Sequence, residues 1–276
     1  MEILLYLTNT VCYAGQSATG KLYASKGGNT QNFNINKALS ATALFLIWLL
    51  LCGNGIHMPT VFHGILYGLF LTVSMHFGFL ALSIGPMALT GMIAAMSLII
   101  PLFWGIMFWK ETITLSVGIG ILLLIGAIGL ICTPKKGSIS KKWICFSILT
   151  LTANGFCSVI QKYHQLSFPG QYQVDFMLYA MLTVTVLTFT LQLLKKQHTF
   201  RPSLLGTLSG CMNGLANLIV LYLAATENAS QLFPLVSAVN VIAAFITGLI
   251  LFHEKIKLLQ CAGILAGIVG IVLLKI

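Results

Sequence analysis

Neutral polar side chains interrupt several long apolar stretches of this 276-residue sequence, and they recur at helical spacing. Amide, hydroxyl, phenol and imidazole groups form hydrogen bonds without carrying a fixed charge. On one face of a membrane helix, such groups indicate a surface that meets protein or water rather than lipid. They favour recognition of a small polar or amphipathic solute. The candidate substrate-binding residues are Tyr13, Gln16, Ser74, His76, Met96, Trp104, Asn154, Asn213, Asn217, Ser237 and Asn240.

Helix packing explains many of the same residues, so both interpretations stay open. Ser and Asn also join membrane helices through hydrogen bonds. A lone histidine such as His76 is typical of a helix interior, and Met96 and Trp104 suit an apolar core. The two interpretations are balanced for the four asparagines. The combination of polar stripes on several segments favours a cavity more than any single residue does.

Acidic residues are few, and all of them lie near predicted segment ends: Glu2, Glu111, Asp175, Glu227 and Glu254. A carboxylate deep in the membrane, which commonly serves proton-driven export of organic cations, is therefore missing from the pattern. Either transport is uncoupled from protons, or His76 or a carboxylate at a helix end carries the proton. A mainly cationic substrate is disfavoured.

Ten apolar segments would have to position these residues. Apolar residues make up 58% of the chain and charged residues 7%, against about 25% charged in a soluble domain, and each membrane helix needs about 20 mostly apolar residues. We therefore expect an all-α membrane protein with ten transmembrane helices. The predicted segments are 3–25, 34–53, 59–82, 86–109, 113–133, 142–165, 172–194, 202–225, 229–252 and 257–275.

Basic residues give a net charge of +10 and gather on one predicted side of the membrane. Twelve of the 15 lysines and arginines flank the loops of that side, and Lys110, Lys162 and Lys275 lie on the other. The positive-inside rule then places both termini outside the cytoplasm. The membrane explains this charge better than nucleic-acid binding does. Lys21 and Lys162 are expected to extend their amines to the lipid headgroups, with an anionic substrate as the alternative.

Enzyme and metal signatures are absent from the sequence. The seven cysteines are scattered without a C-x-x-C pair and are interpreted as small buried residues. Neither H-E-x-x-H nor G-x-S-x-G nor paired aspartates occur within the apolar segments. We expect no enzyme activity, no metal and no cofactor. The first apolar stretch lacks a basic leader and an obvious cleavage site, which favours a retained helix over a signal peptide.

The sequence repeats itself at an offset of 143 positions. The segments FWKETITL and LFHEKIKL place Glu111 against Glu254, and Gly120 meets Gly263 at the same offset. The predicted halves are residues 1–137 and 138–276. Because each half holds five segments, the second half must enter the membrane from the opposite side, which predicts an inverted repeat. These four residues are interpreted as markers of the repeat, with each glutamate capping the helix that follows it.

Residues 81–131 and 223–274 both resemble the EamA-like repeat of the drug/metabolite transporter superfamily. Each has an Ala-rich helix end, a short turn, a helix with a proline (Pro101 and Pro234), a glutamate and a Gly-rich helix. The resemblance implies ten helices around a central cavity, formed mostly by segments 1, 3, 4, 6, 8 and 9. Many members of the family have cytoplasmic termini, which conflicts with the charge count. Close spacing of Gly263 and Gly267 suits packing on the Gly-rich segment 113–133.

The expected function is secondary transport of a small polar or amphipathic metabolite or drug by alternating access, with export as the family habit. The alternatives are a non-transporting membrane scaffold and an intramembrane enzyme. The expected partners are the small-molecule substrate and the lipid bilayer, with no nucleic acid, and the chain would act as a monomer or a homodimer. The plasma membrane is the expected location.

Overall fold

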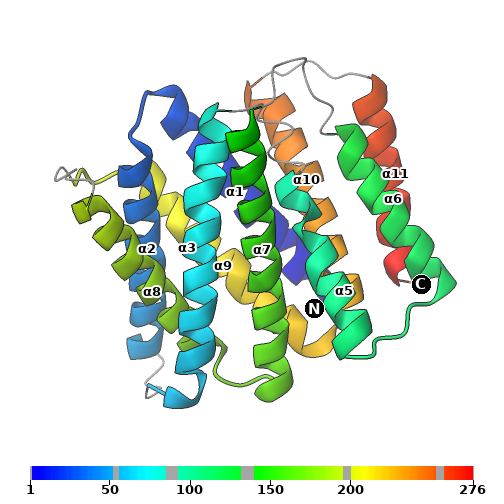
Figure 1. Cartoon of the computed structure of the whole chain (residues 1–276), viewed down its shortest axis with the longest axis horizontal. Helices are drawn as coiled ribbons and strands as arrows, with labels where there is room; N and C mark the ends of the chain where they lie inside the picture. Colours follow the sequence, from blue (N-terminus) through cyan, green and yellow to red (C-terminus); the bar gives the residue numbers. More distant parts are fainter. Residues whose placement is uncertain are drawn as a thin grey trace. The chain divides into compact units, whose positions relative to one another are not determined.

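The structure, a computed structural model, describes residues 2–51, 56–84, 93–131, 140–194, 200–252 and 258–275. Every regular element in these ranges is helical, and ten of the elements are α-helices (Figure 1). The helices are α1 (Glu2–Ser25), α2 (Thr30–Leu51), α3 (Val61–Ile84), α5 (Ile99–Phe108), α6 (Leu115–Ile131), α7 (Lys141–Ser167), α8 (Gln173–Leu194), α9 (Leu204–Thr226), α10 (Ala229–Phe252) and α11 (Leu258–Lys275). Short 3-10 turns precede α3 at Met58–Thr60 and α5 at Met96–Leu98.

Each predicted apolar segment overlaps one of these helices, which confirms the all-α fold. Within the described residues, five helices are long and apolar enough to cross a membrane. Their spans are Gln31–Leu51, Met58–Gly78, Lys141–Ser167, Gln173–Leu194 and Leu204–Thr226. Residues 93–108, 115–130 and 229–243 form shorter apolar helices. The full set of ten spans and their inverted arrangement stay predictions.

The helices form two compact units. The first unit is Met1–Thr72 with Ile160–Ala225, and the second is Val73–Val159 with Thr226–Ile276. Helices α3 and α7 therefore contribute their two ends to different units. Each unit therefore contains residues from both predicted halves, 1–137 and 138–276. The units are defined by contacts, whereas the halves are defined by duplication of the sequence and stay a prediction.

In the first unit, α2 and α3 both pack against α8. The hydroxyls of Thr42 and Thr185 lie 2.9 Å apart between α2 and α8. Gly64 and Gly68 bring α3 close to α8, since a Cβ at Gly64 would lie 2.6 Å from Tyr179 Cβ and one at Gly68 2.6 Å from the Ala180 carbonyl. Small residues four apart allow this approach.

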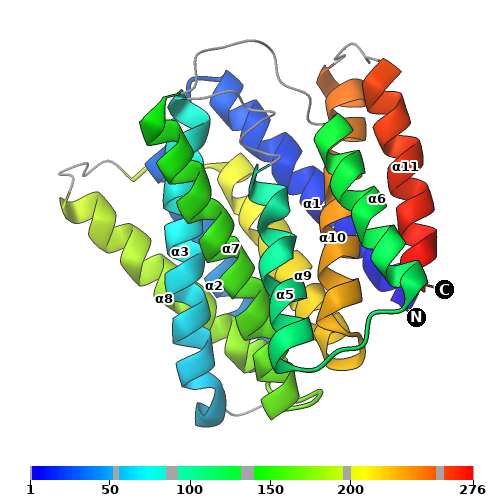
Figure 2. The same ribbon diagram turned by 45° about the vertical axis from the view of Figure 1, so that its right-hand side comes forward.

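In the second unit, α6 packs along α11, and the two helices run side by side in both views (Figures 1 and 2). A Cβ at Gly267 would lie 3.5 Å from Ala127 Cβ, and one at Gly270 2.8 Å from Leu124 Cδ2. Gly120 and Gly263 are buried on the same helices. The predicted packing of the Gly263–Gly267 stretch on the Gly-rich segment 113–133 is confirmed.

Glu111 caps a helix, but not the one expected from the sequence. Its Oε1 accepts the backbone N–H of Ala229 and its Oε2 that of Ser230, both at 2.8 Å. Both donors open α10, so the expectation that Glu111 caps the following helix, α6, is wrong. Lys110, at φ 52°, ends α5 in the left-handed region, and the Glu111 N–H then donates to the Gly105 carbonyl at 3.1 Å. Glu254 lies outside the described residues.

Candidate functional site

Three predicted residues of α1 and α9, Gln16, Asn213 and Asn217, form one hydrogen-bonded group in the first unit. Asn213 Nδ2 donates to Gln16 Oε1 at 2.9 Å, and Asn217 Nδ2 donates to the Asn213 carbonyl at 2.9 Å. Because Asn213 and Asn217 are four apart, both lie on the same face of α9. Each is only 7% exposed. Asn9 joins α1 to the same helix by donating to the Ala216 carbonyl at 2.9 Å.

Helices α3 and α7 extend this group. The Tyr67 O–H donates to Asn217 Oδ1 at 2.7 Å. Gln161 Nε2 donates to the Tyr67 hydroxyl at 3.4 Å and to the Asn217 carbonyl at 3.3 Å. Tyr67 is 1% exposed, and its ring meets Phe176 of α8 at a centroid distance of 5.3 Å. We call Gln16, Tyr67, Gln161, Asn213 and Asn217 the amide network; it joins four helices.

Lys162 is placed differently from its prediction. Its side chain is buried, at 6% exposed, and its Nζ donates to the Ala224 carbonyl near the end of α9 at 3.0 Å. The expected extension towards the lipid headgroups is therefore wrong for this residue. A lysine amine can reach an unpaired carbonyl in the last turn of a helix, and the helix dipole favours a cation there. The side chain of Lys21 lies outside the described part of the structure.

Two predicted residues of the second unit meet each other. The Ser74 O–H, on α3, donates to Asn154 Oδ1, on α7, at 2.6 Å. Trp104 stacks on Phe108 at 4.5 Å and meets the edge of Phe156 at 6.0 Å.

The other predicted residues are half-buried: Tyr13 on α1, His76 on α3, Met96 in the turn before α5, and Ser237 and Asn240 on α10. The Asn240 Oδ1 atom is buried without a hydrogen-bond partner among the described residues. An acceptor left in this state is either a packing defect or a place that a bound molecule satisfies.

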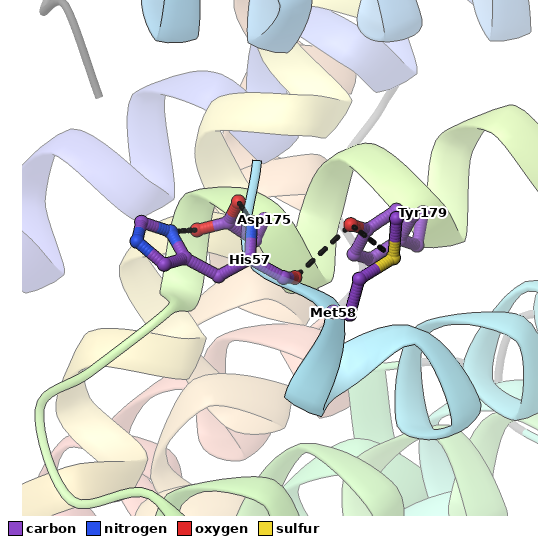
Figure 3. Close-up of polar contacts among 4 residues, drawn as sticks. All are labelled: His57, Met58, Asp175 and Tyr179. Carbon is purple, nitrogen blue, oxygen red and sulfur yellow. Dashed lines mark hydrogen bonds and ion pairs between the residues drawn. The ribbon is translucent and has the colours of Figure 1, made fainter. Parts of the chain in front are cut away.

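A separate polar cluster fastens the entry of α3 to α8 (Figure 3). Asp175 Oδ1 accepts the backbone N–H of His57 at 3.0 Å, and its Oδ2 lies 3.4 Å from His57 Nδ1. The Tyr179 O–H donates to the His57 carbonyl at 3.0 Å and lies 3.8 Å from the Met58 sulfur. Asp175 and Tyr179 both bind main-chain atoms of His57, so we interpret the cluster as structural.

A cavity of about 510 Å³ opens between α2 and α9. Its lining is almost entirely apolar and includes Leu44, Ile47, Trp48 and Cys211. None of the predicted substrate-binding residues lines it. Large apolar side chains such as Leu50 (73%) and Leu122 (71%) are exposed on the helices, as side chains that face lipid would be.

The comparisons with known proteins agree with this architecture. Residues 141–276 match the EamA-like transporter family. The chain carries an EamA-like transporter domain. A solved structure, described only as a crystal structure of a protein, resembles this chain with a TM-score of 0.78 at 15% identity, over 99% of this chain and 98% of that chain. At this identity the likeness shows the fold alone. No curated protein matches the sequence.

With its long apolar helices, the EamA-like chain is an integral, multi-pass membrane protein. Members of this family are generally transporters and not enzymes, and the EamA-like domain points to a small-molecule substrate. Within the described residues, no group of three or more His, Cys, Asp or Glu side chains is placed to hold a metal.

The amide network of the EamA-like chain contains no charged side chain. Amides and a phenol offer donors and acceptors that can be exchanged for those of a solute, whereas a buried charge would need a counter-charge. Each of the network's five side chains makes at least one hydrogen bond to a residue of another helix, which offsets part of the cost of burying it. The arrangement therefore suits recognition of neutral polar groups by exchange of hydrogen bonds.

Sequence reasoning missed Tyr67 and left Gln161 out of the candidate site. A signal for Tyr67 was present, because His63, Tyr67 and Ser74 recur at i, i+4 and i+11 on one helix face. An aromatic residue in an apolar segment is usually a packing residue, so the sequence alone does not mark Tyr67 as a polar-site residue. The hydrogen bond from its hydroxyl to Asn217 does.

Proposed function

We propose that this protein is a secondary transporter that moves a small polar or amphipathic metabolite or drug by alternating access. The single observation that carries the proposal is the uncharged amide network buried across α1, α3, α7 and α9. The EamA-like domain supports the same conclusion. The proposed direction is export, the proposed location is the plasma membrane, and the chain would act as a monomer or a homodimer.

The form of the network favours substrate handling over simple helix packing. A hydrogen bond between two membrane helices contributes only about 0.6–2 kcal/mol, so a scaffold gains little from polar groups on four helices. A transporter needs groups that release one partner and accept another as the solute passes. The Tyr67 hydroxyl and the amides of Asn213 and Asn217 are groups of this kind.

The proposal includes two inverted five-helix halves. Contacts inside each unit support it, because a two-fold relation makes equivalent residues exchange contacts. Thr42 and Thr185, which are 143 positions apart, share a hydrogen bond. At the same offset, Leu124 corresponds to Gly267 and Ala127 to Gly270; Gly270 lies against Leu124, and Gly267 lies against Ala127. Two related halves could exchange conformations and open a shared site to either side in turn.

The test is solute flux through the full-length protein in liposomes. Metabolites that raise its melting temperature would be selected first, and each would then be measured in counterflow against protein-free liposomes. We expect at least one solute to be exchanged, and Asn213→Leu and Asn240→Leu to reduce its flux. If no solute is transported, and cells that carry either variant behave like cells that carry the wild type, the non-transporting scaffold is favoured. A chemically altered solute would favour the intramembrane enzyme.

A further inference from the structure

Two histidines of the first unit meet beside the amide network, and each has a buried ring nitrogen that no described residue binds. His63 of α3 and His164 of α7 meet edge to face, with ring centroids 5.7 Å apart and planes at 79°. His164 is 0% exposed and His63 is half-buried. Among the described residues, His63 Nδ1 and His164 Nε2 have no hydrogen-bond partner. Unpaired buried polar atoms are rare in native proteins and call for an explanation.

The neighbouring glutamine fixes the tautomer of His164. Gln165 Oε1 accepts the backbone N–H of Gly170 at 3.2 Å and lies 3.5 Å from Gln173 Nε2. Since both partners are donors, the atom facing them must be the amide oxygen. The amide nitrogen then faces His164 Nδ1 at 2.9 Å and donates to it. Neutral His164 therefore carries its proton on Nε2.

This geometry allows the pair to hold one added proton. A second proton on His164 would have to bind Nδ1, where it would point at the NH₂ group of Gln165. On His63, by contrast, Nδ1 can keep a lone pair while the proton of the neutral ring sits on Nε2. A hydronium ion loses one O–H bond, and its proton forms a new N–H bond at His63 Nδ1. Water is left behind, and the positive charge passes to the imidazole ring.

We infer that His63 and His164 form a site for a single proton, received by His63, and that this site couples the proposed transport cycle to protons. The inference rests on the proposed function. The two histidines are linked to the amide network through their own helices: Tyr67 follows His63 by four residues, and Gln161 precedes His164 by three. Residues at these separations are neighbours on a helix surface. A charge on His63 thus arises one turn from the Tyr67–Asn217 hydrogen bond.

The ring contacts of the pair among the described residues are with aromatic side chains. Tyr163 of α7 meets the His63 ring at 5.5 Å, and Phe168 meets both histidines. Phe176 of α8 lies 4.5 Å from His164 and also meets Tyr67.

The remaining titratable groups on the elements around the pair have partners of their own. On α7, Lys162 Nζ donates to the Ala224 carbonyl. On α8, Asp175 binds His57, and Tyr179 donates to the His57 carbonyl. Tyr172, before α8, meets the rings of His57 and Phe168. No carboxylate contacts either histidine among the described residues, so an added proton stays on an imidazole.

The proton site can be tested without a substrate, by nitrogen NMR of the full-length protein with labelled histidine in lipid nanodiscs. His63→Gln and His164→Gln assign the two signals. Between about pH 8 and pH 4, which brackets ordinary histidine titration, we expect His63 to change from imidazole to imidazolium. His164 should keep its Nε2–H form throughout. A His63 signal that does not respond to pH, or a His164 signal that becomes imidazolium, overturns the inference.

A single-atom change sharpens the test. In Gln165→Glu, a carboxylate oxygen replaces the amide nitrogen and can accept a hydrogen bond from a protonated His164 Nδ1, so His164 should become imidazolium in the same window. The matched control is Gln171→Glu, which adds the same charge at an exposed position between α7 and α8 and should leave His164 neutral. Equal effects of the two variants would contradict the role given to Gln165.

Coupling is then measured with a solute that passes the counterflow screen. In the wild type, a pH gradient across the liposome should accumulate that solute. His63→Gln should abolish this accumulation and retain counterflow, whereas His57→Gln, at a histidine that is 46% exposed, should keep both. Accumulation that persists in His63→Gln overturns the coupling. If no solute shows counterflow in the wild type, that result counts against the proposed function alone, since the NMR titration still decides the proton site.

Discussion

The two units use similar apolar helices for different kinds of contact. In the first unit, side-chain hydrogen bonds from Tyr67, Gln161 and Asn213 connect helices in the interior. In the second unit, glycine lets α11 lie against α6, and one carboxylate, Glu111, holds the start of α10. A solute can replace one partner of a side-chain hydrogen bond, but it cannot replace one of two helix backbones in close contact. We therefore expect changes in the amide network to act on recognition, and changes at close backbone contacts or at the Glu111 cap to act on stability.

The largest effect is expected at a glycine where two backbones meet. In Gly68→Ala, the new Cβ would lie 2.6 Å from the Ala180 carbonyl oxygen and 2.6 Å from Thr183 Cβ. Helix α3 must then move away from α8, at a loss of about 3 kcal/mol in unfolding free energy. Thermal unfolding in detergent measures the loss. Gly126→Ala is the control, because its Cβ would meet nothing within 4 Å among the described residues; equal losses would contradict the close approach.

The next effect concerns the carboxylate of the second unit. Glu111→Ala removes the acceptor of two backbone N–H groups at the start of α10, which should lower the unfolding free energy by about 2 kcal/mol. Glu111→Gln keeps one oxygen and should lose about half as much. Hydrogen exchange should quicken at Ala229 and Ser230 in Glu111→Ala. Unchanged protection at both amides would show that Glu111 does not cap α10.

A pair of asparagines separates recognition from stability. Asn217→Leu leaves the Tyr67 hydroxyl without its acceptor and should lower the unfolding free energy by about 1 kcal/mol. Asn240→Leu removes a buried acceptor that has no partner among the described residues, so the melting temperature should stay or rise. Solute flux should nevertheless fall in both variants. Unchanged flux in Asn240→Leu would show that its free oxygen does not meet the substrate.

The smallest effect is expected at the hydroxyl pair between α2 and α8. A double-mutant cycle of Thr42→Val and Thr185→Val should give a coupling of about 0.6 kcal/mol, the average for a hydrogen bond between membrane helices. The measurement is unfolding by denaturant of the two single variants, the double variant and the wild type. Additive losses would mean that the 2.9 Å contact contributes nothing to stability.

The helices could be predicted from the sequence because their signal is local. Runs of about 20 apolar residues predict membrane helices, and the predicted segments overlap the observed helices from α1 to α11. The pairing of Gly267 with the Gly-rich α6 could also be foreseen, since small residues at helical spacing mark close contacts.

Partners distant in the sequence could not be foreseen. Glu111 accepts the backbone N–H of Ala229, 118 residues later. No local sequence pattern predicts that its partner is the start of α10. Lys162 was expected to reach the lipid headgroups because it lies near a helix end, but the carbonyl of Ala224 comes within reach only in the folded chain. The pairing of His63 with His164 likewise depends on how α3 meets α7, which spacing within one helix does not reveal.

The most direct measurement of the central claim is the counterflow KM of an exchanged solute in Tyr67→Phe, with Tyr222→Phe as the matched control. Tyr67→Phe removes one buried hydroxyl and keeps the ring on Phe176, while Tyr222 is 43% exposed on α9. If the amide network handles the substrate, KM should rise about tenfold, the equivalent of one hydrogen bond of about 1.4 kcal/mol, only in Tyr67→Phe. The same KM in both variants and the wild type would contradict the claim and leave the network a packing device.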